Sequence, residues 1–467
     1  MDFDVVYIKR VSLKGIHQRY DLDVSFNKTL NVLHGHNGTG KSTLIHIIAN
    51  IANRDFLRFA YLSFDEVLVE YSNRCKIEIL RHGAEPAVLE VKYFDSEGRG
   101  SFFEFLESDA FKSFAVVDEE KWEGREPRTE LTSLMRGFLE GNNVPEINNS
   151  YFPAFRAMLE AWSSQVDEEM RRFRGIAVKR ISVKKVTSFA RGLFGKFLPE
   201  INYPSPLSIE SNVKEEIREA QLKIAQYESS VFSNSFVKVF SAILQDGTSS
   251  DLHAEDLLRE ISELTTESAV NKLVNYEGPS NAYAQLQQLV GASRASRDLA
   301  SSATGALVVY RDALRERRSF QESIFEELDK YFAAVNNFLE QKTLRYVPDT
   351  HRRIPRVGLQ FPDGSWSSIR VMSSGERQLL TMLYAVTKMS ADTLVLIDEP
   401  ELSLHIDWQE ELLEKMMDQL GNRQIIVCTH SPAIASSYQD CMIEVVPILS
   451  SKYASGVDSV DEDEELI

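Results

Sequence analysis

The stretch Gly35-His-Asn-Gly-Thr-Gly-Lys41-Ser42 decides the fold of this 467-residue chain. It matches the phosphate-binding pattern G-x-x-x-x-G-K-[ST], known as Walker A, at every fixed position. The apolar run at residues 30–33 before it favours a strand, and the run at residues 43–49 after it favours a helix. A strand, a glycine-rich loop and a helix in this order predict an α/β fold with a nucleotide site at the end of the strand.

The loop has the chemistry that a triphosphate needs. Glycines let the backbone curl so that successive N–H groups point at phosphate oxygens, and the helix N-terminus adds positive potential. Lys41 would bridge the β- and γ-phosphates, and the Ser42 hydroxyl would be a ligand of Mg²⁺. We therefore expect ATP and Mg²⁺ as cofactors. The residues expected to contact ATP here are Gly35, His36, Asn37, Gly38, Thr39, Gly40, Lys41, Ser42 and Thr43.

Two later segments supply the groups that a phosphate loop lacks for hydrolysis. Thr393-Leu-Val-Leu-Ile-Asp398-Glu399 is a compact apolar run that ends in two acids, as expected of a buried parallel strand. There Asp398 can hold Mg²⁺ through water, and Glu399 can act as the general base that polarises the attacking water. Ile425-Ile-Val-Cys-Thr-His430 places a histidine at a second strand end, where open α/β sheets bind ligands. Lys41, Glu399 and His430 are therefore the predicted catalytic residues.

A fourth segment, Met372-Ser-Ser-Gly-Glu376, precedes an apolar helical run. Ser373 and Glu376 stand at the S-x-x-E spacing of a capping box, which predicts a helix start. A helix start with a serine and a glycine is also a site for an anion. The segment alone leaves open which phosphate it would bind.

The order of these motifs resembles the ABC-type ATPases, and more narrowly the branch that contains the SMC, RecF and OLD proteins (the AAA15 group). Met372–Glu376 aligns with the Leu-Ser-Gly-Gly-Gln signature of the family and departs from it at its first, third and fifth positions. The resemblance implies that two subunits dimerise head to head, with the signature of one closing on ATP held by the other. The signature residues that it places at ATP are Ser373, Ser374, Gly375 and Glu376.

The family pattern includes two further elements, the D-loop and the Q-loop. Leu402-Ser-Leu-His405 resembles the D-loop that couples the two sites of the dimer, with Ser403 and His405 as its polar residues. No residue could be matched to the Q-loop glutamine.

Other stretches resemble the ATPases of bacterial anti-phage defence. Tyr151-Phe-Pro-Ala-Phe-Arg156 and the segment from Phe194 to Ser205 are similar to segments of these proteins. Size and layout most resemble the AriA ATPases of PARIS systems, with the PtuA ATPases of Septu as the near competitor. The resemblance implies a homo-oligomer that holds a separate Toprim nuclease of the AriB kind and releases it on sensing a phage protein. OLD proteins carry a Toprim domain after the ATPase, whereas only 37 residues follow His430 here, so we expect a separate effector.

The distribution of proline divides the chain. Of 14 prolines, only Pro279 lies between residues 207 and 347, and apolar residues there recur at three- and four-residue steps. We predict an ATPase head built from residues 1–205 and 341–450, a largely helical, coiled-coil-like insert at 206–340, and an acidic tail at 451–467.

Charge is unevenly placed along a chain with a formal net charge of −18. No acid interrupts residues 171–196, so this stretch is either a solvated surface or a binding surface for DNA or for an acidic, DNA-mimicking phage protein. The last ten residues hold six acids and no base. The candidate partner surface consists of Arg171, Arg172, Arg174, Lys179, Arg180, Lys184 and Lys185.

Composition narrows the class of protein. Apolar runs are shorter than a membrane helix needs, the first residues do not form a signal peptide, and three scattered cysteines form neither a disulfide framework nor a metal site. We expect a cytoplasmic ATPase without a membrane partner. Three functions stay open: a defence sensor, a DNA-repair ATPase of the RecF/SMC kind, and a scaffold in which ATP is mainly a clamp.

Overall fold

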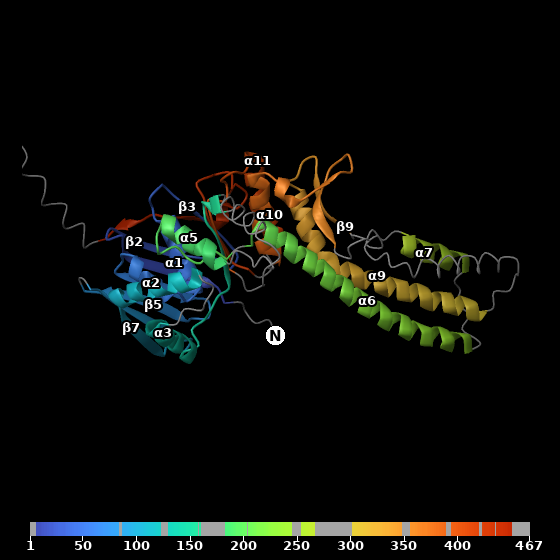
Figure 1. Cartoon of the computed structure of the whole chain (residues 1–467), viewed down its shortest axis with the longest axis horizontal. Coiled ribbons are helices and arrows are strands. Elements are labelled where there is room, and N and C mark those ends of the chain that lie inside the picture. The colour runs from blue at the N-terminus through green and yellow to red at the C-terminus, as the bar shows by residue number, and fades with distance from the viewer. Residues whose placement is uncertain are drawn as a thin grey trace, which may run out of the picture. The chain divides into compact units, whose positions relative to one another are not determined.

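The computed structural model describes residues 6–83, 86–122, 129–156, 158–159, 183–202, 204–244, 254–266, 301–347, 355–388, 394–419, 423–434 and 436–450. The chain divides into two compact units. The head unit comprises Met1–Ser205 and Met372–Ile467, and the helical unit comprises Pro206–Val371 (Figure 1). All four nucleotide motifs lie in the head unit.

A parallel sheet of five strands, in the order β14-β3-β13-β12-β8, carries the motifs. Every neighbouring pair in it is parallel, so all carboxyl ends lie at one edge. Each residue of β12 and β13 is buried, as expected of strands covered on both faces. The fold class predicted from the sequence is confirmed. The strands are β3 (Leu30–His34), β8 (Asn149–Phe152), β12 (Leu394–Asp398), β13 (Ile425–Cys428) and β14 (Met442–Glu444).

Helices cover this sheet. α1 (Lys41–Ala52) begins at the phosphate loop and packs against β8, β12 and β13 through an apolar face that includes Leu44, Ile47 and Ile48. α10 (Ser374–Lys388) and α11 (Ile406–Gln419) pack against each other. The helices begin at the ends of the motifs, so the position of each motif is fixed on both sides by buried structure.

An antiparallel sheet of seven strands, in the order β15-β2-β1-β4-β5-β6-β7, completes the head unit. Buried Gln424 links the two sheets, because it accepts a hydrogen bond from the Ile8 N–H (3.1 Å) and donates to the carbonyls of Ile8 and Asn27 (2.9 Å each). The strands are β1 (Ile8–Ile16), β2 (Tyr20–Ser25), β4 (Glu66–Tyr71), β5 (Lys76–His82), β6 (Val88–Phe94), β7 (Gly100–Leu106) and β15 (Ile448–Leu449).

Residues 196–202, which follow α5 (Val183–Phe194), lie beside β8 and are held there by hydrogen bonds. Asn202 pairs with the edge of β8 by donating to the Asn149 carbonyl and accepting from the Tyr151 N–H. Arg58 donates to the Lys196 carbonyl (3.1 Å), and Arg191 donates to the Leu198 carbonyl (2.8 Å). Further helices of the head unit are η1 (Phe56–Tyr61), α2 (Glu107–Trp122), α3 (Glu130–Gly141) and η4 (Gln439–Cys441).

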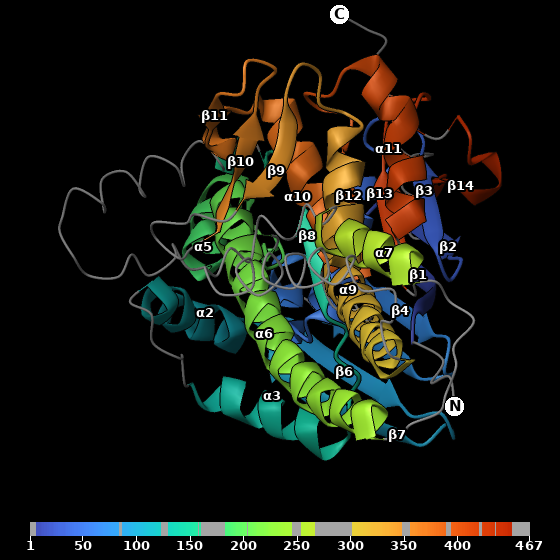
Figure 2. The same cartoon turned by 90° about the vertical axis from the view of Figure 1, so that its right-hand side faces the viewer.

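The helical unit contains two long helices, α6 (Pro206–Leu244) and α9 (Ser301–Asn336), which lie side by side (Figure 2). α7 (Ala254–Thr266) packs on α9. The predicted helical pattern is confirmed over α9. Six apolar residues of this pattern are buried, five within α9 and one just after its end. They are Leu307, Leu314, Leu328, Tyr331, Val335 and Phe338.

The boundary predicted between residues 340 and 341 differs from the structure. A small antiparallel sheet and a short helix after it belong to the helical unit, not to the head. The reason is packing: Leu344 and Leu359 are buried, and Asn336 at the end of α9 exchanges two hydrogen bonds with the Leu344 backbone. The elements are β9 (Thr343–Val347), β10 (Arg356–Gln360), β11 (Trp366–Ser367) and η3 (Ile369–Val371). The acidic tail lies outside the described residues.

One contact joins α1 to β8 and makes the stability of the head depend on pH. The His46 ring meets the Tyr151 hydroxyl at 2.7 Å, with the two rings edge to face. Burial lowers the pKa of His46 from its ordinary value of 6.5 to about 4. The unfolded chain therefore takes up this proton first, and stability is lost as the pH falls from 6.5 towards 4.

We predict that the free energy of unfolding of wild type falls more steeply between pH 7 and pH 5 than that of His46→Gln. The expected difference is on the order of 1–2 kcal/mol, because each unit of pKa shift corresponds to about 1.4 kcal/mol. Denaturant unfolding at the two pH values measures it. Equal slopes for the two proteins would contradict the assignment.

Candidate nucleotide site

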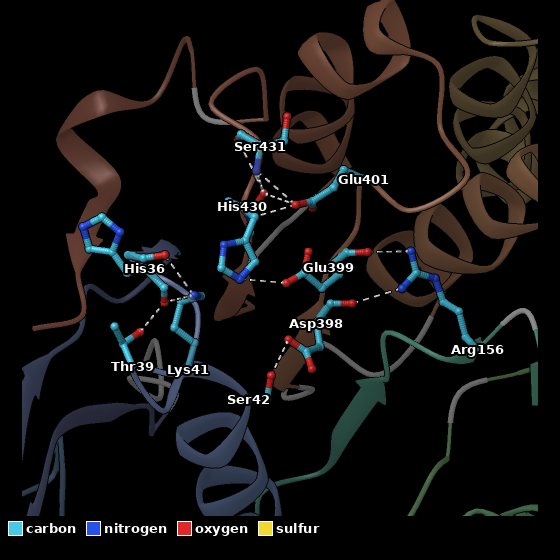
Figure 3. A network of polar contacts seen from close by, with 12 residues as sticks. His36, Thr39, Lys41, Ser42, Arg156, Asp398, Glu399, Glu401, His430 and Ser431 are labelled. Carbon is cyan, nitrogen blue, oxygen red and sulfur yellow. Dashed lines mark hydrogen bonds and ion pairs between the residues drawn. The ribbon is translucent and has the colours of Figure 1, made fainter. Parts of the chain in front are cut away.

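The phosphate loop is curled around the ammonium group of Lys41. The Lys41 side chain is 5% exposed, and its Nζ donates to the carbonyls of Gly35 (3.0 Å) and His36 (3.1 Å) (Figure 3). Gly38 and Gly40 have φ values of 80° and 90°, in the left-handed region that other residues adopt at a cost. No side chain caps the start of α1, so its first N–H groups face the loop as donors for an anion.

Ser42 and Asp398 form the part of the site that fits Mg²⁺. The Ser42 hydroxyl donates to Asp398 Oδ1 at 3.2 Å, although 356 residues separate them. Asp398 is 5% exposed; burial raises its pKa, while the Ser42 hydrogen bond and the charges of Arg156 and Lys41 act in the opposite direction. A hydroxyl and a carboxylate are the hard oxygen ligands that Mg²⁺ takes together with phosphates and water.

Within the residues that the structure describes, no group of three or more His, Cys, Asp and Glu side chains could hold a metal ion. Ser42 and Asp398 supply two oxygen ligands, and phosphate oxygens and water would supply the others when a nucleotide is bound.

Glu399 and His430 lie directly beyond the ends of β12 and β13. His430 Nε2 and Glu399 Oε1 are 3.2 Å apart (Figure 3). Burial, together with the charge of Glu401, raises the pKa of Glu399 to about 7, and burial lowers the pKa of His430. A carboxylate with a pKa near neutrality is suited to accept a proton from water.

Glu401 is a residue of this site that sequence reasoning missed. Its Oε1 accepts three hydrogen bonds, from the Thr429 hydroxyl (2.8 Å) and from the N–H groups of His430 (2.7 Å) and Ser431 (3.0 Å). One carboxylate thus fixes the turn after β13 to the loop after β12. The sequence carried no signal for this contact, because the partners lie 28 to 30 residues away.

Arg156 is the second missed residue, although its segment was noted for its resemblance to defence ATPases. The side chain is fully buried, and its guanidinium donates to the carbonyls of Asp398 (3.0 Å), Glu399 (3.0 Å) and Pro400 (3.2 Å). The sequence carried no sign of its role, because the segment after β8 matches none of the nucleotide-binding motifs and four of its acceptors lie 222 to 244 residues away.

The signature segment forms the predicted capping box. The Glu376 N–H donates to the Ser373 hydroxyl (3.3 Å), and the Ser373 N–H donates to Glu376 Oε2 (2.7 Å). Ser374 is the first residue of α10. Gly375 faces the D-loop: a Cβ at this position would lie 2.5 Å from the Ser403 carbonyl oxygen. Contact of these residues with ATP stays a prediction.

The D-loop lies at the surface of the head unit. Leu402 is 43% exposed, and the His405 side chain, which pairs with Asp407 at 3.3 Å, is 68% exposed. Ser403 adopts a φ of 68°, which turns its carbonyl towards Gly375. The polar residues of the loop are therefore open to a second molecule.

The candidate basic surface is not described by the structure. Arg171, Arg172, Arg174, Lys179 and Arg180 lie outside the described residues, and the side chains of Lys184 and Lys185 at the start of α5 are also outside them. Arg191, a further base of the same stretch, is buried at 3% exposure and serves the packing of the head.

Comparison with known proteins decides the family. The family model AAA_15, described as an AAA ATPase domain, matches residues 7–435. The chain belongs to the AAA_15 family. The phosphate loop, the acids after β12 and the histidine after β13 are thus parts of one ATPase domain that spans both units.

Curated relatives of this AAA_15 protein include two retron proteins. The probable ATPase of retron Vc95 from Vibrio cholerae serotype O1 biovar El Tor is 26% identical over 114 residues, 22% of each chain. The probable ATPase of retron Ec83 from Escherichia coli is 24% identical over 140 residues, 26% of each chain. The AAA_15 chain therefore spans about a quarter of the length of these relatives.

Solved structures similar to this AAA_15 protein include Smc heads. The Smc head domain of Pyrococcus furiosus with an extended coiled coil gives a TM-score of 0.37 at 14% identity, covering 98% of this chain and 100% of that one. A Smc head with coiled coil and joint from Pyrococcus yayanosii gives 0.32 at 13% identity, covering 97% and 99%. Among the described helices, none is long and apolar enough to cross a membrane.

We predict that Gly375→Ala destabilises the head by on the order of 1–3 kcal/mol, because the new methyl group would overlap the Ser403 carbonyl. Gly137→Ala is the matched control, since Gly137 is also helical but has open space around its Cβ position. The control should gain about 0.5–1 kcal/mol from the better helix former. Chemical denaturation measures both changes. A Gly375→Ala protein as stable as the control would show that the D-loop does not approach this glycine.

Proposed function

We propose that this AAA_15 ATPase binds ATP between two heads, hydrolyses it, and acts as the sensor and scaffold of an anti-phage defence system. The observation that carries the hydrolytic part is the pair of Glu399 and His430, 3.2 Å apart beyond two adjacent strands. Phosphate binding alone would not need this pair. A base beside a histidine at the carboxyl edge of the sheet fits activation of a water molecule.

The residues divide the work of hydrolysis among them. Lys41 and the loop N–H groups bind the phosphates, and Ser42 with Asp398 would hold Mg²⁺, which neutralises phosphate charge when bound. Glu399 accepts the proton of the attacking water through a carboxylate oxygen. His430, fixed by the contact of Glu401 with its N–H, orients Glu399 and the water.

Two features support dimerisation of the heads. The D-loop is exposed, with Leu402 and His405 open to solvent. The signature segment packs on that loop at Gly375, and Ser373 and Ser403 beside this contact are both exposed. In the proposed dimer, Ser373 and Gly375 of one subunit close on ATP held at Lys41 of the other. Higher homo-oligomers are part of the same proposal.

The defence role rests on two kinds of similarity. Two of the matched relatives are retron ATPases, matched over 114 and 140 residues. Two stretches resemble defence ATPases: the one at residues 151–156 begins within β8, and in the one at residues 194–205 Asn202 pairs with the edge of β8. We propose a cytoplasmic protein that holds a separate nuclease-type effector, similar to AriB, and releases it when a phage protein, such as an acidic DNA mimic, binds. PtuA of Septu is the near alternative.

A second candidate function is a DNA-binding repair ATPase of the RecF/SMC kind. The sequence feature that favours it is the run of nine basic residues without an acid at 171–196, of which Arg191 is buried in the head. DNA carries its charge densely, so such a run would supply salt-dependent affinity.

We predict that Lys41→Ala abolishes ATP binding and that Glu399→Gln keeps binding but lowers kcat by about 10²–10⁴-fold, the usual contribution of a general base. Because its ATP is not consumed, Glu399→Gln should accumulate as the dimer. Equilibrium nucleotide binding, phosphate release and mass measured with and without ATP check all three results. Wild-type turnover by Glu399→Gln would remove this residue from the mechanism.

Binding of the proposed effector is tested by purifying the protein from the cells in which it is encoded. We predict that the chain purified with its neighbouring gene product carries a nuclease-type protein in fixed stoichiometry, and that Lys41→Ala changes the amount bound. Stimulation of ATPase activity by DNA, without a bound effector, would favour the repair function instead. Purified complexes, analysed by mass with and without ATP, and an ATPase assay with duplex DNA separate the two.

A further inference from the structure

The backbone of the loop that carries Glu399 is held by one buried cation, the guanidinium of Arg156. Arg156 is fully buried, and its guanidinium donates to the carbonyl oxygens of three consecutive residues. Figure 3 shows the contacts with Asp398 and Glu399, and the third is with Pro400. Consecutive carbonyls in an extended strand point in opposite directions, so they cannot all meet one group. The chain must therefore curl around Arg156 at the point where β12 ends.

The backbone of Glu399 records this curl. Its φ of 51° lies in the left-handed region, which is unfavourable for a residue with a Cβ. Such a conformation persists where the surroundings over-determine it, and it is common at functional sites. Here the surroundings include the guanidinium on the carbonyl side and Cys428 on the other, whose carbonyl accepts from the Glu399 N–H at 2.9 Å.

The same guanidinium connects two further elements to the loop. It donates to the Pro153 carbonyl at the end of β8 (3.1 Å) and to Gln378 Oε1 in α10 (3.1 Å). Gln378 lies two residues after the signature segment and is itself 1% exposed. Only a planar group with several fixed donors can satisfy acceptors in this spread of directions; the ammonium of lysine is a single point.

We propose that Arg156 is a positioning residue for ATP hydrolysis, which sets the loop after β12 so that the Glu399 carboxylate faces His430 and the attacking water. Arg156 does not touch the nucleotide in this role. It acts through the backbone of Asp398, Glu399 and Pro400, and through Gln378 it ties the signature helix to the same loop. The inference rests on the proposed role of Glu399 as general base.

The test separates positioning from general packing. Arg156→Lys keeps the charge but loses the fork of donors, and Arg58→Lys is the matched control. Arg58 is equally buried in the head unit and also donates to a backbone carbonyl, that of Lys196 at 3.1 Å, but it does not contact the loop of Glu399 in its described hydrogen bonds. Glu399→Gln, measured alongside, reports on the base itself. All variants are made in the full chain, and thermal midpoint, affinity for a fluorescent ATP analogue and kcat are measured for each.

We expect Arg156→Lys to bind the ATP analogue within about threefold of wild type and to lose roughly 30- to 100-fold in kcat, because small misplacement of a catalytic group costs about this much. Arg58→Lys should lose a similar amount of thermal stability while its kcat stays within about twofold, as expected for a residue remote from the reacting atoms. A Gln378→Met variant, which removes one acceptor and keeps the volume, should lower kcat by about three- to tenfold without weakening binding.

The outcomes distinguish the two proposals. Equal turnover by Arg156→Lys and Arg58→Lys, with Glu399→Gln inactive, overturns the positioning role alone. Wild-type turnover by Glu399→Gln overturns the base assignment and the inference with it. Where Arg156→Lys fails to fold, Gln378→Met decides: an unchanged kcat overturns the inference, and a lowered kcat with intact ATP binding supports it.

Discussion

The parallel pairing of β3, β13 and β12 is the constraint on which the rest of the head depends. Val427 lies opposite Val32 on one side and Ile397 on the other, so strands from both ends of the chain meet in one register. That register brings Lys41, Asp398 and His430 to the same edge of the sheet. A shift of one residue would point each strand's side chains to the opposite face, and Ser42 could no longer meet Asp398 at 3.2 Å.

Buried polar groups hold the two segments that follow the strands, the loop after β12 and the turn after β13. The loop after β12 is not stable in this conformation through its own residues alone, because Glu399 has a strained backbone and Asp398 is buried near another acid. Arg156 supplies donors to its carbonyls, and Glu401 supplies an acceptor to the N–H groups of the neighbouring turn. Hydrogen bonds among buried groups favour the arrangement in which they form, since losing one of them leaves a buried polar atom unpaired at a cost in free energy. The site is thus rigid where it must hold a carboxylate and a histidine 3.2 Å apart.

The sequence predicted those parts of the site whose chemistry is local. The phosphate loop, the acids after an apolar strand and the capping box of Ser373 each occupy a few consecutive residues, and the structure places the first two together at one edge. The roles of Arg156 and Glu401 were not predicted, because they depend on partners far along the chain. Four of the acceptors of Arg156 lie 222 to 244 residues away. The boundary predicted between residues 340 and 341 differs for another reason: β9 turns back onto the end of α9, where Asn336 exchanges two hydrogen bonds with Leu344, eight residues further on.

The central claim is that the edge formed by β3, β12 and β13 holds ATP for hydrolysis with Glu399 facing its γ-phosphate. The most direct measurement is an experimental structure of the Glu399→Gln chain with ATP and Mg²⁺. The account predicts the γ-phosphate at Lys41, the metal at Ser42 and Asp398, the residue-399 side chain beside the attacking water, and Ser373 of a second subunit closing the site. ATP bound elsewhere, or at this edge with residue 399 turned away from the γ-phosphate, would contradict it.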